Sequence, residues 1–192
     1  MYQGNFFNDQ KHGDGFSYYK DGNVLYRGQY VKDRLNGMGS FYHENGNIKC
    51  EGFWNNDKLS GSGKHFHING NLNMDGFFSK NYFKGIFYDE DRVKKYEGDM
   101  VKDLTYGNYL KEGKGKSFFD NGLVEYDGEW KTNKFFGIGQ LYYINGKLKY
   151  NGGFEDNKYS ELGMKYDLCE NLMCIGIWKN GCLESIQLTH DH

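Results

Sequence analysis

The sequence repeats with a period of 24 residues, and this period restricts the possible folds more than any other feature. Its centre is a glycine with apolar, mostly aromatic side chains two positions before and after it, as in YDGEW at residues 126–130. Eight such glycines, called anchors here, occur along the chain: Gly4, Gly28, Gly52, Gly76, Gly98, Gly128, Gly152 and Gly176. A fixed period of this length indicates a repeat architecture in which each unit contacts its neighbours.

Each repeat also carries the signals of a β-hairpin. Side chains alternate between the two faces of a strand, so the anchor and the residues two positions away share one face. In the sixth repeat the other face holds Asp127, Glu129 and Lys131. A G-x-G pair follows four of the eight anchors by nine and eleven residues, a fifth pair is shifted by an insertion, and an Asn-Gly or Asp-Gly turn usually precedes the next anchor. The pattern predicts two antiparallel strands per repeat, with one aromatic and one mostly polar face.

These hairpins predict an all-β fold. We expect residues 1–192 to form a single array, an elongated, single-layer antiparallel meander of about eight β-hairpin repeats. It should be twisted and curved, since large flat sheets are unusual. No segment shows a sustained 3.6-residue apolar pattern, so essentially no helix is expected.

The array is predicted to be irregular at residues 82–116 and 159–172. The fourth repeat has Phe87 where the second glycine is expected, and its turn, DEDR, is predicted to be two residues short. The fifth has six extra residues in LTYGNYLKEGKG. The seventh has Glu161 and Glu170 in place of glycines. The eighth is expected to be incomplete, stopping after its first strand in LESIQLTHDH.

The repeat resembles the MORN family (membrane occupation and recognition nexus). The family motif is approximately Y-x-G-x-W/F, then N/D-G-K, then G-x-G, then a turn glycine, and YDGEWKTNKFFGIGQLYYINGKLKY follows it closely. The resemblance covers residues 2 to about 180. It implies a ribbon of hairpins that acts as a non-catalytic scaffold or partner-binding module. Family members occur in cilia and flagella, in other cytoskeletal structures, at membrane junctions and attached to lipid-kinase domains.

The composition restricts the cellular location and the classes of partner that we expect. The net charge of −2 gives no general attraction to nucleic acid or anionic membrane. The N-terminus shows no secretory signal, no apolar run approaches a membrane span, and four cysteines without a C-x-x-C pair fit a reducing compartment. Abundant Asn, Lys, Tyr and Phe without proline suggest an AT-rich protist genome. We therefore expect an intracellular protein of the cytoplasm or cytoskeleton, in a cilium or flagellar axoneme.

The sequence predicts no enzyme, cofactor or metal centre. The G-x-G pairs precede strands, whereas a phosphate loop needs a following helix. No nucleophile elbow or pair of catalytic carboxylates stands out. Zinc ligands are conceivable near the C-terminus, but their spacing matches no common zinc knuckle, and Cys174 occupies the position of the packing residue before the anchor. The residues in question are Cys169, Cys174, Cys182, His190 and His192, and the role of the three cysteines stays open.

Histidines and basic residues leave two alternatives open. His43, His65 and His67 could form a cross-strand ladder that titrates near neutral pH, although ordinary strand residues are expected. Basic residues gather loosely in Lys32/Arg34, Lys111/Lys114/Lys116 and Lys131/Lys134. Polybasic lipid recognition takes a denser cluster, and acidic residues intersperse these. A peripheral membrane scaffold that binds acidic phospholipids such as phosphoinositides, or a regulatory module associated with a lipid kinase, is therefore the alternative function.

The aromatic face leads to the main functional prediction. A single-layer sheet has no second layer to cover its apolar face, and large exposed apolar stripes mark interaction sites. We expect an aromatic groove that holds a segment of a partner protein or another copy of the chain. Its predicted residues are Tyr30, Trp54, Phe78, Trp130, Phe154 and Trp178. The competing interpretation is that these side chains serve only intramolecular packing.

Overall fold

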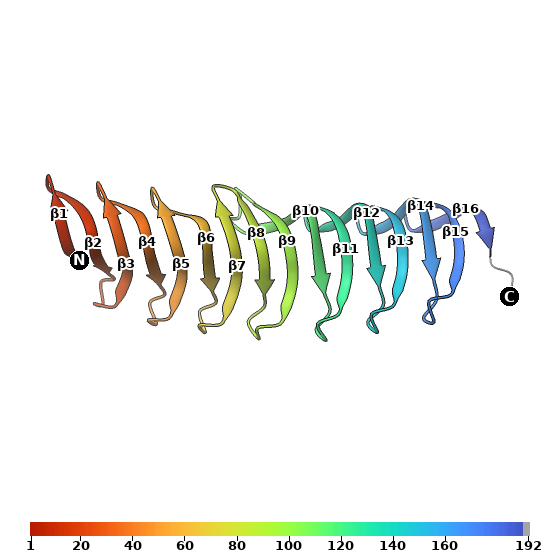
Figure 1. Cartoon of the computed structure of the whole chain (residues 1–192), viewed down its shortest axis with the longest axis horizontal. Helices are drawn as coiled ribbons and strands as arrows, with labels where there is room; N and C mark the ends of the chain where they lie inside the picture. The colour runs from red at the N-terminus through yellow and green to blue at the C-terminus, as the bar shows by residue number, and fades with distance from the viewer. Residues whose placement is uncertain (190–192) are drawn as a thin grey trace. The chain divides into compact units, whose positions relative to one another are not determined.

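The protein is an antiparallel meander in which sheet order follows sequence order from β1 to β16. The computed structural model describes residues 1–189, and the side chains of residues 1–187. No helix occurs in this described part of the chain. The predicted all-β hairpin fold is therefore confirmed (Figure 1).

The chain divides into two compact units, Met1–Val93 and a second that begins at Lys94. Within each unit the strands lie side by side and bow along their length (Figure 1). Unit 1 contains β1 (Tyr2–Phe7), β2 (Gln10–Tyr18), β3 (Val24–Val31), β4 (Arg34–Tyr42), β5 (Ile48–Asn55), β6 (Lys58–Phe66), β7 (Leu72–Ser79) and β8 (Tyr82–Tyr88). Unit 2 contains β9 (Lys94–Lys102), β10 (Tyr109–Phe118), β11 (Val124–Lys131), β12 (Lys134–Tyr142), β13 (Leu148–Glu155), β14 (Lys158–Tyr166), β15 (Leu172–Lys179) and β16 (Cys182–Thr189).

Two-residue turns join most odd-numbered strands to the strands that follow them. Lys32 and Asp33, between β3 and β4, have φ values of 51° and 65°, as a type I′ turn requires. The Asp33 carboxylate accepts a hydrogen bond from the Lys11 backbone N–H at 2.9 Å. Asp57 accepts one from Leu35 in the same way at 2.8 Å. Each of these turns therefore also binds its hairpin to the preceding repeat.

The other end of the hairpins is tied by side chains that reach the next repeat. Tyr19 donates to the carbonyl of Tyr42 at 2.7 Å. At the same repeat position, His43 Nε2 lies 3.3 Å from the Phe66 carbonyl and His67 Nε2 lies 3.1 Å from that of Tyr88. His65 instead stacks on Phe78, with ring centroids 4.9 Å apart. His65 lies in β6, whereas His43 and His67 directly follow β4 and β6, so the expectation of ordinary strand residues holds for His65 alone.

The anchor glycines and the second glycines of the G-x-G pairs alternate in a ladder across each unit. Gly28 pairs with Gly39, and Gly39 pairs in turn with Gly52. A Cβ atom at Gly28 would lie 2.5 Å from the Cα of Gly39 and 2.5 Å from the hydroxyl of Tyr26. The Tyr26 ring therefore covers the ladder, and only glycine leaves room for it.

A bulge next to the ladder explains the first glycine of each G-x-G pair. Between the Gly28–Gly39 and Tyr30–Leu35 pairs, strand β4 has three residues where β3 has one. Gly37 lies in this bulge at a φ of 108°, which L-residues rarely adopt. In the seventh repeat Glu161 takes the equivalent left-handed conformation at a φ of 56°.

The fourth repeat corrects one prediction. Its turn has normal length, since the Asp89 N–H bonds to the Val93 carbonyl as that of Tyr19 bonds to Asn23. The two missing residues come from the bulge instead. Gly76 pairs with Gly85, and Phe77 with Lys84, with no register shift. Gly85 therefore takes the place of the second glycine, and Phe87 was wrongly aligned with it.

The eighth repeat corrects another. It does not stop after its first strand, because β16 pairs with β15 through residues 182–189. The turn between them is Asn180–Gly181, both at positive φ, and Asn-Gly is a strong hairpin signal. The pairing has two register shifts, and Gly176 faces Ile186 instead of a glycine. The absent G-x-G pair is what obscured this strand in the sequence.

Candidate protein-interaction surface

The six aromatic residues predicted to line a groove lie in the core. Their exposed fractions are 2% for Tyr30 and Phe78, 3% for Phe154, 4% for Trp130 and 6% for Trp54 and Trp178. The expectation that this face leaves an exposed aromatic stripe is therefore wrong for these positions. In this structure they pack within the chain.

The sheet covers its aromatic face with its own residues. The Trp130 indole N–H bonds to the Gly115 carbonyl at 2.9 Å, which lays the ring across the glycine ladder. The ring of Phe135, from the start of β12, stacks on Tyr126 with centroids 3.9 Å apart. Tyr159 stacks on Tyr150 at the same distance. Rings from the start of the second strand thus supply the cover that a second layer would otherwise provide.

Burial also shows in the ionisation of the core tyrosines. Desolvation raises the pKa of Tyr126 and Tyr150 well above the ordinary value of 10, and that of Tyr159 to about 12. Burial likewise raises the pKa of the Cys50 thiol to about 11. These groups are neutral at physiological pH and have no arrangement that would activate them as nucleophiles.

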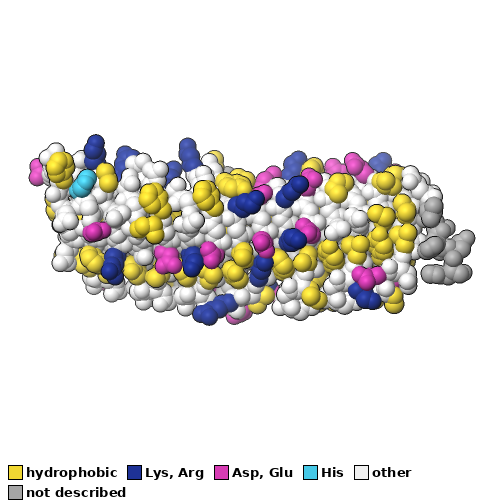
Figure 2. Space-filling view, in the orientation of Figure 1, with side chains coloured by type: hydrophobic (Ala, Val, Ile, Leu, Met, Phe, Trp, Pro, Cys, Tyr) yellow, Lys and Arg dark blue, Asp and Glu magenta, His cyan; other side chains and the backbone are white. Residues whose placement is uncertain are grey.

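The opposite face of unit 1 carries two rows of side chains, one on each side of the glycine ladder. The first row crosses β3 to β7 and is charged or polar: Arg27, Ser40, Glu51, Lys64 and Asp75 are successive cross-strand partners. The second row holds Met38, Phe53 and Phe77, with exposed fractions of 61%, 46% and 55%. Figure 2 shows charged and apolar side chains next to each other on this face.

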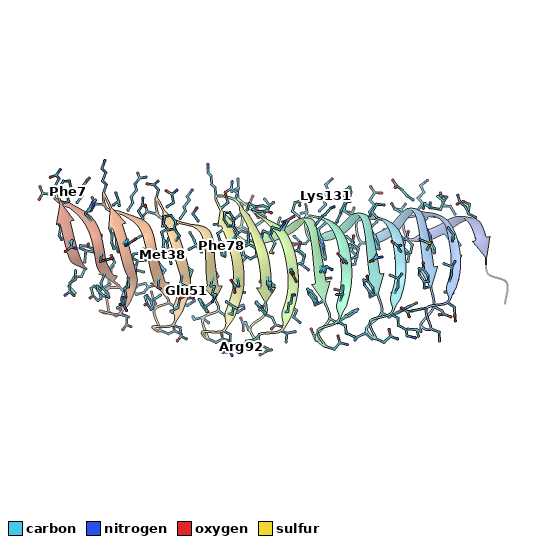
Figure 3. The ribbon with its side chains drawn as sticks, in the orientation of Figure 1. Phe7, Met38, Glu51, Phe78, Arg92 and Lys131 are labelled. Atoms are coloured by element: carbon cyan, nitrogen blue, oxygen red, sulfur yellow. The ribbon has the colours of Figure 1, made fainter. Side chains whose placement is uncertain are left out.

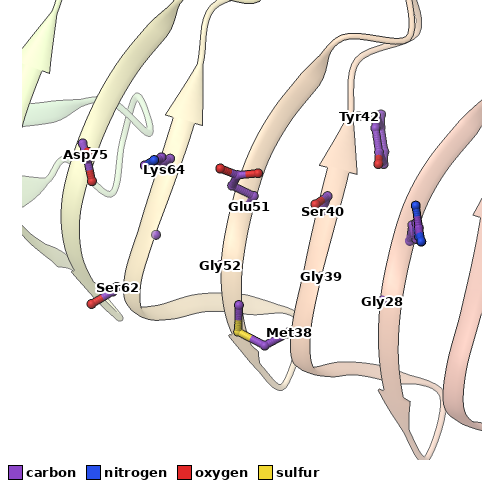
Figure 4. A pocket seen from close by; sticks show the side chains of 12 residues that line it. Gly28, Met38, Gly39, Ser40, Tyr42, Glu51, Gly52, Ser62, Lys64 and Asp75 are labelled. Atoms are coloured by element: carbon purple, nitrogen blue, oxygen red, sulfur yellow. The ribbon is translucent and has the colours of Figure 1, made fainter.

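A groove of about 530 Å³, which we call the outer groove, lies along the charged row, with Met38 and Ser62 lining its other side and Phe53 and Phe77 outside its lining. Gly28, Gly39, Gly52 and Gly63 line its floor, where no side chain rises. In the close-up, Met38 lies toward one end of the strands and the side chains of the charged row toward the other (Figure 4). Figure 3 marks Met38 and Glu51 on the same face in the whole chain. The glycines that admit the core tyrosines on one face thus leave a depression on the other.

The side chains of the charged row that are described form no ion pairs with one another. Glu51 pairs across strands with Lys64, and Lys64 with Asp75. Among the described residues, however, no N–O contact within 4 Å joins these side chains. Lys64 and Glu51 both line the outer groove, so their charges are available to a bound segment. The sequence predicted a mostly polar face, but neither this row nor the groove beside it.

In unit 2, two of the basic side chains have partners within the chain. Lys116 forms an ion pair of 2.7 Å with Asp127. Lys111 lies over the ring of Trp130 at 4.4 Å, and burial lowers its pKa. The basic cluster predicted at residues 111–116 is therefore largely engaged within the chain.

The six-residue insertion of the fifth repeat forms an ordered loop between β9 and β10. Asp103 accepts a hydrogen bond from the Thr105 N–H at 2.7 Å, and its backbone bonds to Asn108 and Gly107. Leu104 and Tyr106, at the tip, are 78% and 79% exposed. The insertion lies where the sequence predicted it, within residues 82–116.

The cysteines show no arrangement for metal binding in the described residues. Cys174 is buried, Cys169 and Cys182 are exposed, and none is in a disulfide. No group of three or more His, Cys, Asp or Glu side chains within the described part could hold a metal ion. His190 and His192, also considered as ligands, lie outside the described residues. Nor does this part contain a helix that is long and apolar enough to cross a membrane.

The repeats are recognised by comparison with known families. The family model described as MORN repeat matches residues 2–24, 26–48, 50–71 and 126–147. Three of these segments lie in unit 1 and one in unit 2. A search of curated proteins found no match to this chain.

Proposed function

We propose that this chain, which contains four MORN repeats, is a non-catalytic scaffold that binds partner proteins through the outer groove of unit 1. Proteins built on MORN repeats are generally non-catalytic repeat scaffolds. The predicted partners are other subunits of a larger assembly, with self-association as a second form of the same role. A cytoskeletal or ciliary assembly is the setting we propose.

The observation that carries the proposal is the exposed row of Met38, Phe53 and Phe77 beside unpaired charges. Met38 and Phe53 are direct cross-strand partners, so their side chains form one continuous apolar surface. Ser62 separates them from Phe77, to which it is paired. Apolar side chains next to a charged row provide burial for affinity and charge for orientation. This surface replaces the buried aromatic residues as the candidate binding groove.

The proposal is tested by affinity capture from the source cells, using the wild-type chain and Met38→Glu/Phe53→Glu. Both side chains are about half exposed or more, so the variant should retain its melting temperature. We expect specific partners to be identified by mass spectrometry with the wild type and lost with the variant. Fluorescent tagging of the same two chains should show whether cytoskeletal localisation depends on the groove.

Ile144→Glu is the matched control, because Ile144 is 67% exposed at a turn of unit 2. It adds a charge on an exposed apolar residue outside the outer groove. Partners retained by this variant but lost by the groove variant support the proposal. Equal capture by all three chains, or no specific capture by the wild type, contradicts it.

A further inference from the structure

Four charged side chains line the outer groove of unit 1, and their signs alternate across the sheet. In order from β3 to β7 they are Arg27, Glu51, Lys64 and Asp75. Ser40, a neutral residue, occupies the same row on β4, between the first two charges. The row therefore reads positive, neutral, negative, positive and negative, with one position on each successive strand.

The distances between these charges follow from the sheet. Neighbouring strands lie roughly 4.8 Å apart, so the later three charges lie roughly 10, 14 and 19 Å from Arg27, measured across the strands. The neutral position on β4 makes the first interval twice as long as the others. The spacing is therefore asymmetric, and it differs when the row is read from the other end.

An α-helix that lies across the strands matches this spacing. It rises about 1.5 Å per residue, and residues i, i+7, i+11 and i+14 share one face. These residues lie roughly 10, 16 and 21 Å along the axis from the first, which is within about 2 Å of the charges in the groove. In an extended segment, residues on one face repeat at roughly 6.6 Å, which exceeds the interval of one strand.

The floor and the apolar border of the groove also suit a helix. The four glycines of the floor carry no side chains, so a helix can approach the backbone of the sheet. Met38, on the other side of the groove, is 61% exposed and stands one strand away from Arg27 (Figure 4). An apolar residue three positions after the first charged residue of the helix reaches Met38, because it lies roughly 4.5 Å further along the axis.

Unit 2 differs from unit 1 in this row. Its equivalent positions hold Lys116 and Asp127, which form an ion pair of 2.7 Å, followed by Gln140, Asn151 and Met164. In the part of the chain that the structure describes, none of the four charges of unit 1 has an ion-pair partner within 4 Å. Only unit 1 therefore presents a row of alternating, unpaired charges beside a groove.

We propose that the outer groove binds an amphipathic α-helix of the partner and fixes the direction of that helix. This inference rests on the proposed function, because it concerns the same groove. A helix with acidic, basic, acidic and basic residues at i, i+7, i+11 and i+14 places each charge opposite its complement when it runs from β3 to β7. Turned end to end, it brings a basic residue opposite Arg27 and an acidic residue opposite Asp75. Like charges that face each other are unfavourable, so one direction is selected.

The test measures the binding of two alanine-rich peptides to the full chain by fluorescence anisotropy at physiological salt. Each peptide forms a helix of about 18 residues, or five turns, with a leucine at i+3. The matched peptide has glutamate, lysine, glutamate and lysine at the four positions, and the reversed peptide has lysine, glutamate, lysine and glutamate. Circular dichroism checks that their helix contents are equal. The matched peptide should bind roughly tenfold more tightly or better; equal affinities, or binding of neither peptide, overturn the proposal.

An exchange of charges within the chain locates the binding. In Glu51→Lys/Lys64→Glu the row reads positive, neutral, positive, negative and negative, and the net charge is unchanged. This variant should lose the matched peptide and bind instead a peptide with glutamate, glutamate, lysine and lysine at the four positions. Lys116→Asp/Asp127→Lys is the control, because it makes the equivalent exchange in unit 2. An unchanged preference in the groove variant, or the same change in the control, contradicts the proposal; melting temperatures exclude unfolding as the cause.

The helix and the proposed function can fail separately. Met38→Glu/Phe53→Glu tests whether the groove captures partners of any structure, and the peptides test whether a helix of this charge order is the occupant. Groove-dependent capture without selective binding of the matched peptide overturns the helix and leaves the proposed function in place, with an extended segment or a second copy of this chain as the occupant. Equal capture by the wild type and the groove variant contradicts the proposed function, whatever the peptides show.

Discussion

Arg34 in unit 1 and Lys134 in unit 2 occupy the same position of the repeat, yet among the described residues only Lys134 of the two forms an ion pair. Asn56 stands beside Arg34 where Asp156 stands beside Lys134. The two turns otherwise share the two-residue geometry with both residues at positive φ. A difference of one side chain, at turns of the same backbone geometry, thus decides whether the cation forms an ion pair within the chain.

The faces of the two units differ in the same way. Lys64 of unit 1 has no ion-pair partner within 4 Å among the described residues, whereas Lys116 of unit 2 is paired with Asp127 at 2.7 Å. Both lysines lie one residue past the second glycine of their repeat. The comparison shows that glycines and aromatic residues hold the interior of the repeat constant. The exterior positions carry different charges in the two units, and the proposed partner binding depends on them.

The largest expected loss of stability comes from substituting a glycine of the ladder, which both units have in their interior. A Cβ atom at Gly128 would lie 2.6 Å from both the Cα of Gly139 and the hydroxyl of Tyr126. Gly128→Val should therefore destabilise unit 2 by about 3 kcal/mol or more, although valine is the better strand former. Gly28→Val should do the same in unit 1. Thermal unfolding followed by near-ultraviolet circular dichroism measures both effects.

Glu129→Val is the control for this comparison, since its side chain lies on the other face of the same strand. Its melting temperature should change little. An unchanged melting temperature in Gly128→Val would refute the role assigned to the glycine ladder. A loss in one unit but not the other would show that the interior is not shared.

High pH should destabilise the two units to different extents, and this effect should be smaller than that of the glycine substitutions. The pKa of Tyr126, Tyr150 and Tyr159 is raised by burial, so these side chains stay neutral in the folded protein while unfolded tyrosine ionises near its ordinary value of 10. Stability is therefore intact below about pH 10 and falls as the pH rises further, by roughly 1 kcal/mol per buried tyrosine at about pH 10.5. In unit 1 the strongest such shift is that of Tyr26.

With Cys50→Ala in every variant, because the buried Cys50 thiol of unit 1 also has a raised pKa, tyrosine ionisation should consequently destabilise unit 2 more than unit 1 in alkaline solution. Tryptophan fluorescence separates them, because a variant that keeps only Trp54 reports on unit 1 and one that keeps only Trp130 reports on unit 2. Tyr126→Phe should reduce the pH dependence of unit 2. A melting temperature that stays constant between pH 8 and pH 11 would contradict the assigned burial.

The smallest effect is expected from two substitutions that exchange the turn residues between the units. Asp156→Asn removes the exposed ion pair with Lys134 and should destabilise unit 2 by about 0.5 kcal/mol. Asn56→Asp should stabilise unit 1 by a similar amount through Arg34. Urea unfolding at low and high salt measures both changes, which should shrink as salt increases. Effects of the same sign in both variants would show that the two turns are not equivalent.

Much of the fold could be predicted because its causes are local. The strand pattern around Gly128, the Asn-Gly and Asp-Gly turns and the period between anchors each depend on residues close in sequence. The same spacing predicted that Gly128 and the flanking aromatic residues share one face, and the position of Tyr126 over the ladder agrees with it. The bulge was missed, so the fourth repeat was misaligned at Phe87.

The candidate sites could not be predicted to the same degree. Trp130 and the other five aromatic residues were expected to be exposed because a single-layer sheet has no second layer. That reasoning did not foresee Phe135 and Tyr159, which stack over the tyrosines from the start of the second strand. Phe53 was one of many apolar residues at strand positions, and nothing in its local sequence distinguished it.

The sequence by itself determined the repeat, the hairpins and the need for glycine at each anchor, because backbone conformation and side-chain alternation are set by neighbouring residues. Only the tertiary structure decided which side of the sheet faces solvent and which charges are neutralised. Arg27 and Asp75 are far apart in sequence and line one groove because successive hairpins lie side by side. Burial and electrostatic pairing depend on such distances in space, which the linear pattern does not contain.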